Sequence, residues 1–205
     1  MVHGRVVTVY ADVVCPFTHV GLRRLVEHRR RTGREDVRLH VRAWPLEIVN
    51  GRPLDPALVA EEIEALRARV ASDLFVGFDP ARFPSTSAPA FALAAAAYRR
   101  DLTTGEQVSL ALRDALFEDG EDIADPSVLD AIAAPFEIHV EDVDVASVER
   151  DRADGLARGV IGSPHFFTAD GSAFCPSLEI ARDERGALRI ETATGVEDFL
   201  TACFA

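Results

Sequence analysis

Hydrophobic and polar residues alternate in two short segments near the N-terminus, residues 5–11 and 37–43. A two-residue period rich in β-branched side chains is typical of a β-strand. Between these segments, residues 17–31 have apolar side chains at helical spacing, and Gly33 follows as a helix stop. Because a helix joins the two strands, we expect a βαβ unit with parallel strands and a right-handed connection.

The middle of the chain changes to a helical period and is rich in Ala and Leu. Asp55 is a predicted N-cap of the first helix here, Thr104 of the third and Asp125 of the fourth, since short polar side chains accept hydrogen bonds from free helical N–H groups. Five helices are predicted, over residues 56–71, 89–101, 104–118, 127–134 and 144–158.

The last part of the chain returns to short apolar segments separated by turn residues, which predicts two hairpins and a closing helix. The predicted strands are residues 164–168, 173–175, 178–180 and 187–190, and the predicted helix is residues 196–204. The order of elements therefore predicts an α/β fold with an all-helical insertion. Residues 1–54 and 159–205 would form the α/β domain, and residues 55–158 the inserted helical domain.

Composition narrows the class of protein. The 205 residues are 48% hydrophobic and 27% charged, which is enough apolar material for a folded core. The net charge of -12 argues against a general binder of nucleic acid or of an anionic membrane. No apolar stretch approaches the ~20 residues of a membrane span. The N-terminus has no signal-peptide pattern, so we expect a cytoplasmic protein.

The charge is unevenly distributed. Every basic residue is Arg, and residues 1–54 carry a net charge of +5, residues 55–158 of -13 and residues 159–205 of -4. The acidity therefore belongs mainly to the predicted helical insertion. A locally positive environment in the first segment would favour a thiolate there, and an anionic thiol as its partner.

The chain has three cysteines, Cys15, Cys175 and Cys203, and no C-x-x-C pair. A disulfide framework is not expected at this size, and no His/Cys cluster has the spacing of zinc ligands. Cys15 lies between a predicted strand and a predicted helix, and Pro16 follows it. Free N–H groups at a helix start stabilise an anion and lower a thiol pKa. The alternative is that Cys15 is a small buried apolar residue.

A second segment has a proline at the start of a predicted strand, directly after a stretch with two glycines. Its sequence is Gly159-Val160-Ile161-Gly162-Ser163-Pro164. Such a proline is a candidate for a cis peptide bond, although the trans form is far commoner. Each of the two segments is a weak signal when taken alone. Their order along the chain and the predicted topology make the pair considerably more specific.

The two segments together resemble the DsbA family of thioredoxin-fold proteins. Residues 8–18, T-V-Y-A-D-V-V-C-P-F-T, are similar to the first strand and C-P-x-x motif of that family, and residues 159–164 to its cis-proline loop. The resemblance covers nearly the whole chain, since family members carry a helical insertion. It is nearest to the cytoplasmic branch with FrnE-like oxidoreductases and 2-hydroxychromene-2-carboxylate isomerases.

This resemblance implies a thioredoxin fold with Cys15 as the nucleophile. Pro164 would have a cis peptide bond and pack against Cys15. Backbone groups around Ser163 would then receive a peptide-like or glutathione-like substrate. The substrate-binding residues that the resemblance implies are Pro16, Phe17, Ser163, Pro164 and His165. We expect no metal and no tightly bound cofactor, glutathione as a candidate co-substrate, and a small thiol or disulfide-containing substrate. Monomer and homodimer both remain open.

The chain departs from the dithiol pattern at Thr18, where a dithiol enzyme has its resolving cysteine. Cys15 could act as a monothiol with glutathione as the resolving thiol, or Cys175 could resolve it. A glutathione-dependent isomerase or kappa-class transferase is another alternative, although such enzymes usually have Ser at the Cys15 position. The last alternative is a non-catalytic binding module. Of these, a monothiol thiol–disulfide oxidoreductase is the favoured prediction.

Other polar side chains near the two motifs have candidate roles. Thr18 would donate a hydrogen bond to the sulfur of Cys15 and hold it as a thiolate, so it is a candidate catalytic residue. A buried carboxylate at Asp12 would raise the thiol pKa of Cys15 or take its proton, whereas an exposed one would only cap the loop, and the capping role is preferred. His165 is preferred over His19 as a general acid, because the helix direction turns His19 away. Four aromatic residues would either wall a groove over Cys15 or pack between the subdomains: Trp44, Phe75, Phe78 and Phe83.

Overall fold

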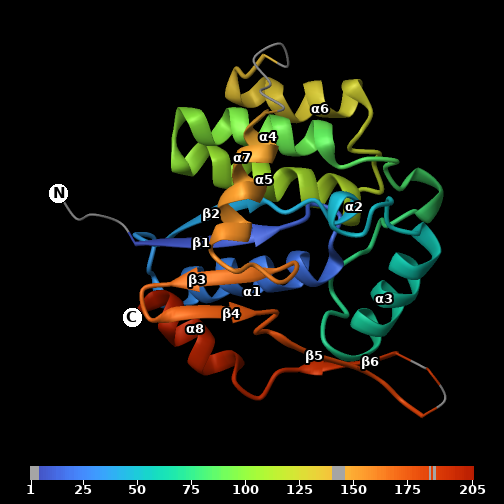
Figure 1. The fold of residues 1–205 in the computed structure, drawn as a ribbon, viewed down its shortest axis with the longest axis vertical. Helices are drawn as coiled ribbons and strands as arrows, with labels where there is room; N and C mark the ends of the chain where they lie inside the picture. Colours follow the sequence, from blue (N-terminus) through green and yellow to red (C-terminus); the bar gives the residue numbers. More distant parts are fainter. Residues whose placement is uncertain (1–4, 140–145, 185, 187) are drawn as a thin grey trace.

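The computed structural model describes residues 5–139, 146–184, 186 and 188–205. Its main sheet has four strands in the order β2-β1-β3-β4 (Figure 1). The strands are β1 (Val6–Ala11), β2 (Arg38–Ala43), β3 (His165–Thr168) and β4 (Gly171–Phe174). β1 pairs with β2 in parallel and with β3 antiparallel, and β3 pairs antiparallel with β4. The predicted βαβ unit and the first hairpin are therefore confirmed.

Helices cover both faces of this sheet. On one face, α1 (Pro16–Thr32) and α8 (Val196–Phe204) pack against alternate residues of β1, including Val7 and Val9, and against Phe166 of β3. On the other face lies α7 (Ala146–Ala157), which crosses in front of the sheet in Figure 1. The alternation of β1 thus places its apolar residues against α1 and α8.

Two helices of the insertion run along the outer strand β2, namely α4 (Ala88–Arg100) and α5 (Leu102–Phe117). The hydroxyl of Tyr98 accepts from the N–H of Val41 at 2.9 Å and donates to the carbonyl of Leu39 at 3.0 Å. The N–H of Leu39 donates to the carboxylate of Glu106 at 2.7 Å. Side chains of the insertion therefore satisfy backbone groups that an edge strand would leave free.

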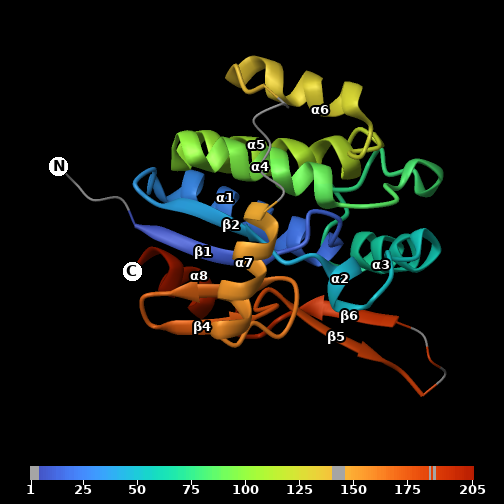
Figure 2. The ribbon, with the colours of Figure 1, turned by 45° about the horizontal axis from the view of Figure 1, so that its top comes forward.

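The remaining elements are short helices, turns and a separate hairpin. The helices are α2 (Leu46–Val49), α3 (Pro56–Arg69) and α6 (Pro126–Ala133), and the 3-10 turns are η1 (Pro80–Arg82) and η2 (Ala134–Phe136). The second hairpin, β5 (Leu178–Arg182) with β6 (Leu188–Thr192), forms its own two-stranded sheet. This hairpin extends away from the main sheet in Figures 1 and 2.

The predicted N-caps Asp55 and Asp125 are confirmed, since each accepts a hydrogen bond from the first turn of its helix. The predicted cap Thr104 is wrong. Asp101 caps α5 instead and accepts from the N–H of Thr104 at 2.9 Å. Residues 144 and 145, the predicted start of the helix observed as α7, lie outside the described residues. Among the described residues, no helix is long and apolar enough to cross a membrane.

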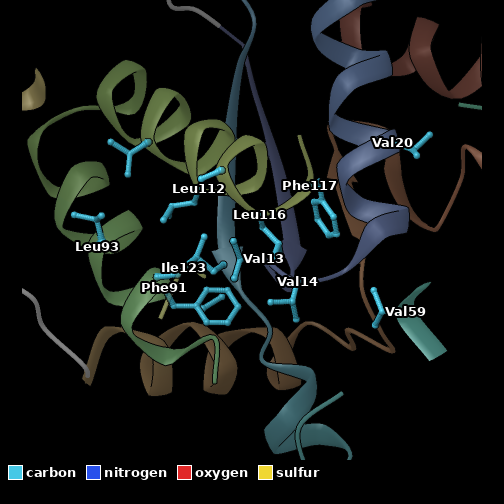
Figure 3. Packing of buried hydrophobic residues seen from close by; sticks show 14 of the residues in the cluster. Val13, Val14, Val20, Val59, Phe91, Leu93, Leu112, Leu116, Phe117 and Ile123 are labelled. Carbon is cyan, nitrogen blue, oxygen red and sulfur yellow. The ribbon is translucent and has the colours of Figure 1, made fainter. Parts of the chain in front are cut away.

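The largest hydrophobic cluster joins the insertion to the loop after β1. Val13 and Val14 of that loop belong to the same buried cluster as Leu116 of α5 and Ile123, as Figure 3 shows. Val59 of α3 and Ile190 of β6 extend the cluster toward the second hairpin. The helices of the insertion thus pack directly behind the loop that leads into α1. The division at residues 54/55 and 158/159 stays a prediction.

Candidate active site

Cys15 is the N-cap residue of α1, and Pro16 is the first residue of the helix. The loop between β1 and α1 places the side chain at the C-terminal end of β1, where only 2% of Cys15 is exposed. Its thiol donates to the backbone carbonyl of Ser163 at 3.5 Å. Two segments that lie 148 residues apart in the sequence therefore meet at this sulfur.

Ser163 connects the two segments by further hydrogen bonds. Its Oγ accepts from the N–H of Asp12 at 2.8 Å and lies 3.0 Å from Oγ1 of Thr18. The Ser163–Pro164 peptide bond is cis. Thr18, where a second thiol would stand in a C-x-x-C motif, instead holds the loop that carries Ser163. Pro164 is buried, and its carbonyl accepts from the N–H of Cys175 at 2.9 Å.

The thiol of Cys15 does not have the lowered pKa that its place at a helix start predicts. Burial is the largest influence and raises the pKa of Cys15, while hydrogen bonding by Ser163 and Thr18 lowers it. The negative charge of Glu62 raises it further. The expected positive environment does not outweigh this burial, since the pKa is raised overall. Burial therefore favours the thiol form of Cys15.

A buried ionisable pair lies behind the loop. Asp12 is fully buried, and its carboxylate accepts from the N–H groups of Val14 at 3.1 Å and Leu46 at 2.6 Å. Burial raises the pKa of Asp12 to about 6, and the hydrogen bonds and Arg113 lower it in part. Asp12 therefore caps the loop as predicted, but from a buried position rather than an exposed one.

Arg113 of α5 is the cation of this pair. The guanidinium is buried, donates to the carbonyl of Asp12 at 3.2 Å and to Ser109 at 2.8 Å, and leaves its Nε without a hydrogen bond. Burial lowers the pKa of Arg113 to about 10, and the negative charges of Asp12 and Cys15 raise it. Arg113 stays protonated at neutral pH and places a positive charge within electrostatic reach of Cys15.

Cys15 opens into a pocket of about 510 Å³. One wall comes from the start of α1 and from Ser163, and the opposite wall from α3 and the loop before it. The lining mixes apolar side chains with polar and charged ones. These residues are Cys15, Pro16, Phe17, Leu46, Asn50, Arg52, Pro53, Leu54, Asp55, Leu58, Val59, Glu62 and Ser163.

Comparison with known proteins identifies the family. The chain matches the DSBA-like thioredoxin domain over residues 6–183. It belongs to this family. No curated protein sequence matches it significantly. The α/β arrangement with a helical insertion is the thioredoxin-like fold that the sequence predicts.

Solved structures similar to this DSBA-like chain share its fold. A 2-hydroxychromene-2-carboxylate isomerase is 16% identical, with a TM-score of 0.63, over 82% of this chain and 88% of the other. The cytosolic disulfide reductase DsbM from Pseudomonas aeruginosa is 16% identical, with a TM-score of 0.59, over 96% and 95%. DsbM with GSH is 15% identical, with a TM-score of 0.57, over 82% and 88%. At these identities the likeness shows the fold alone.

The predicted site residues divide into two groups in this DSBA-like structure. Pro16, Phe17 and Ser163 line the pocket beside Cys15, whereas Pro164 and His165 are not among its lining residues. The ring of His165 stacks on Phe167 with centroids 4.8 Å apart. Its Nδ1 accepts from the N–H of Ile161 at 3.3 Å, and burial lowers the pKa of His165.

His19 points away from the pocket, as its position on α1 predicts. Its Nε2 lies 2.7 Å from a carboxylate oxygen of Glu118, and its ring packs against Phe75 and Phe117. Phe78 and Phe83 contact each other, while Trp44 clusters with Tyr10 and Val160 across the sheet. None of the four predicted groove aromatics is among the lining residues of this pocket, so their packing role is the observed one.

All three cysteines are free thiols. Cys175 is buried next to the loop of Pro164 and has a positive φ of 45°. Burial raises the pKa of Cys175 to about 12, and the nearby charge of Cys15 contributes to the increase. Cys203 lies on α8 and is buried within the cluster that contains Val7 and Phe166. Within the described residues, no group of three or more His, Cys, Asp or Glu side chains could hold a metal ion.

Sequence reasoning missed two charged neighbours of Cys15. Arg113 left a signal, because it lies on the apolar side of α5 beside Leu112 and Leu116, where a charge is unusual. The sequence gives no such signal for Glu62, because it stands between Glu61 and Ile63, next to the polar side of α3, and resembles a solvent-exposed residue. The fold of the insertion over the start of α1 is what brings Glu62 to the pocket.

Proposed function

We propose that this protein is a thiol–disulfide oxidoreductase that uses Cys15 as its single nucleophile. The observation that carries the proposal is the position of the Cys15 thiol. It caps α1, lines a pocket, and lies 3.5 Å from the carbonyl of Ser163 in the proline loop. Thr18 replaces the second thiol of a dithiol enzyme, so the resolving thiol must come from elsewhere.

In the first step, the Cys15 thiolate attacks a substrate disulfide. A bond forms between Sγ of Cys15 and one substrate sulfur, the substrate S–S bond breaks, and the other half leaves as a thiolate that takes up a proton. In the second step, a small thiol attacks the mixed disulfide and releases Cys15 as a thiolate. Each step exchanges one disulfide for another, so no further oxidant or reductant is needed.

The pocket supports a small peptide-like thiol, such as glutathione, as this second thiol. Phe17, Leu54 and Leu58 offer apolar contacts for a ligand backbone. Asn50 and Arg52 offer hydrogen-bond donors for its carboxylates. The similarity to DsbM with GSH agrees with this substrate class, and a cytoplasmic location is proposed with it.

Adduct mass spectrometry with oxidised glutathione tests the proposal. The wild type is expected to gain one glutathione mass on the peptide that contains Cys15, and Cys15→Ser to gain none there. Cys203→Ser, which removes a buried thiol outside the pocket lining, is the matched control and should form the adduct like the wild type. An unmodified Cys15 after prolonged incubation, under conditions where reduced protein remains folded, would refute the proposal.

Cys175→Ser separates the two ways in which Cys15 could be resolved. If Cys15 works as a monothiol, the adduct accumulates equally in the wild type and in Cys175→Ser until a thiol is added. If Cys175 resolves it, the wild type forms an internal disulfide and only Cys175→Ser retains the adduct. The burial that raises the pKa of Cys175 to about 12 makes Cys175 a poor nucleophile, which favours the monothiol outcome.

A glutathione-dependent isomerase or transferase, of the 2-hydroxychromene-2-carboxylate isomerase or kappa class, is the second candidate. The raised pKa of the Cys15 thiol favours it, because such chemistry activates the sulfur of glutathione rather than that of the protein. Retention of reduced glutathione in Cys15→Ser, measured by calorimetry, without any covalent adduct in the wild type would support this candidate. The pocket at Cys15 supports both enzymatic candidates over a closed binding module.

A further inference from the structure

Glu62 and Cys15 line the same pocket from two different segments of the chain. It belongs to α3, from which Leu58, Val59 and Glu62 line the pocket at helical spacing, while Cys15 lines it from the start of α1. The negative charge of Glu62 acts on the thiol and raises the pKa of Cys15. A carboxylate and a candidate nucleophilic thiol therefore share one pocket of about 510 Å³.

The carboxylate of Glu62 is not engaged elsewhere. Within the described residues it has no hydrogen bond and no ion pair, although it is partly buried. Its neighbour Glu61 differs, because Glu61 is exposed and pairs with Arg182 of β5 at 3.3 Å. Burial raises the pKa of Glu62 to about 7, Glu61 raises it and Arg182 lowers it. A carboxyl group that titrates near neutral pH can both accept and donate a proton.

The charged groups around Glu62 come from several elements. Arg52 and Asp55 line the same pocket from the loop before α3, and Arg182 approaches from β5. On the other elements that pack on α3, the charges have partners of their own. Arg82 of η1 pairs with Glu121, Arg189 of β6 with Glu191, and Arg24 of α1 with Glu27.

We propose that Glu62 is the proton-transfer group for thiol exchange at Cys15. The inference rests on the proposed oxidoreductase function. The Glu62 carboxylate accepts the proton of the Cys15 thiol, and the thiolate attacks the substrate disulfide. The Cys15–substrate S–S bond forms, the substrate S–S bond breaks, and the departing thiolate takes the proton from Glu62. The products are a mixed disulfide, a free thiol and the Glu62 carboxylate.

Two reactions of Cys15 distinguish proton transfer from a simple charge effect. Alkylation by iodoacetamide needs a thiolate but releases iodide, which takes no proton. Exchange with oxidised glutathione releases a thiolate that does take one. Glu62→Gln removes a negative charge, so alkylation near neutral pH should be as fast as in the wild type or faster. Exchange should become about tenfold slower, because its proton donor is lost.

Glu61→Gln is the matched control, since it makes the same change one residue away and outside the pocket lining. It is expected to follow the wild type in both reactions, and Glu62→Asp should recover part of the exchange rate. The exchange rate of the wild type should change its slope with pH near the pKa of Glu62, at about 7, and Glu62→Gln should lose that change.

Two results would overturn the role of Glu62 while leaving the oxidoreductase function intact. One is that Glu62→Gln accelerates both reactions, which assigns the residue a charge effect alone. The other is that Glu62→Gln and Glu61→Gln behave alike. If instead the wild type forms no glutathione adduct at Cys15, the oxidoreductase function itself fails, and the role of Glu62 fails with it. Thermal unfolding of each variant verifies that the compared proteins are folded.

Discussion

Asp12→Asn tests whether the buried carboxyl behind Cys15 destabilises the folded protein at neutral pH. Burial raises the pKa of Asp12 from 3.8 to about 6 in the folded state. Between these two values the folded state binds more protons than the unfolded state, so the free energy of unfolding falls as the pH rises. The favourable contribution is complete below the unfolded pKa and is lost as the pH rises through the folded pKa.

The size of the effect follows from the shift. A shift of about two pKa units at ~1.4 kcal/mol each gives about 3 kcal/mol in total, of which about 2–3 kcal/mol is lost between pH 4 and pH 7. Asn has no charge to titrate, so this pH dependence should be absent in Asp12→Asn. The amide retains one of the two acceptors that serve Val14 and Leu46, and the loss of the other adds an offset independent of pH.

Urea unfolding at several pH values between about 4 and 7 measures the difference between the two proteins. Asp12→Asn should gain about 2–3 kcal/mol relative to the wild type as the pH rises across that range. Contributions from other groups, including Glu62, are common to both proteins and cancel. Asp73→Asn, a change at an exposed aspartate, should run parallel to the wild type. A parallel curve for Asp12→Asn as well would refute the account of Asp12.

Two further substitutions test the contacts around the sheet and the thiol. Gly155→Ala would place a Cβ 2.8 Å from the indole of Trp44 and should destabilise the protein by about 1–3 kcal/mol in urea unfolding. The control Gly195→Ala meets no atom within 4 Å and should stay within about 0.5 kcal/mol of the wild type. Arg113→Met removes the buried cation near Cys15 and should raise the pKa of the thiol. Alkylation of Cys15 by iodoacetamide at neutral pH should then become about 3- to 10-fold slower. An unchanged rate would exclude an electrostatic role for Arg113.

The order of elements could be predicted from the sequence because it depends on local patterns. β1, β2 and α8 follow directly from two-residue and helical periods. The prediction of Thr104 as the cap of α5 was wrong for a local reason too. Asp101 both ends α4 and caps α5, whereas the prediction made it the last residue of the helix 89–101 and placed the cap at Thr104. A connection of one residue leaves no loop signature in the sequence.

The site could be predicted in part. Cys15, Thr18 and Ser163 lie together because two motifs mark the ends of neighbouring strands in a thioredoxin-like sheet. The electrostatics of the thiol could not be predicted in the same way. The position of Cys15 at a helix start favours a lowered pKa, but burial under tertiary neighbours raises it. That burial depends on contacts between distant segments, which no local pattern encodes.

The net charge of the segment that carries the thiol does not determine the charge around Cys15, because the inserted helices contribute to it as well. The segment of residues 1–54 has a net charge of +5, yet the charges that act on Cys15 are Glu62 of α3 and Arg113 of α5. They oppose each other, because Arg113 favours the thiolate from the core and Glu62 disfavours it from the pocket. The C-P-F-T motif therefore marks Cys15 as the candidate nucleophile without specifying its pKa. The same motif beneath a different insertion would have a different reactivity, and substitutions on α3 and α5 should tune Cys15 while leaving the motif intact.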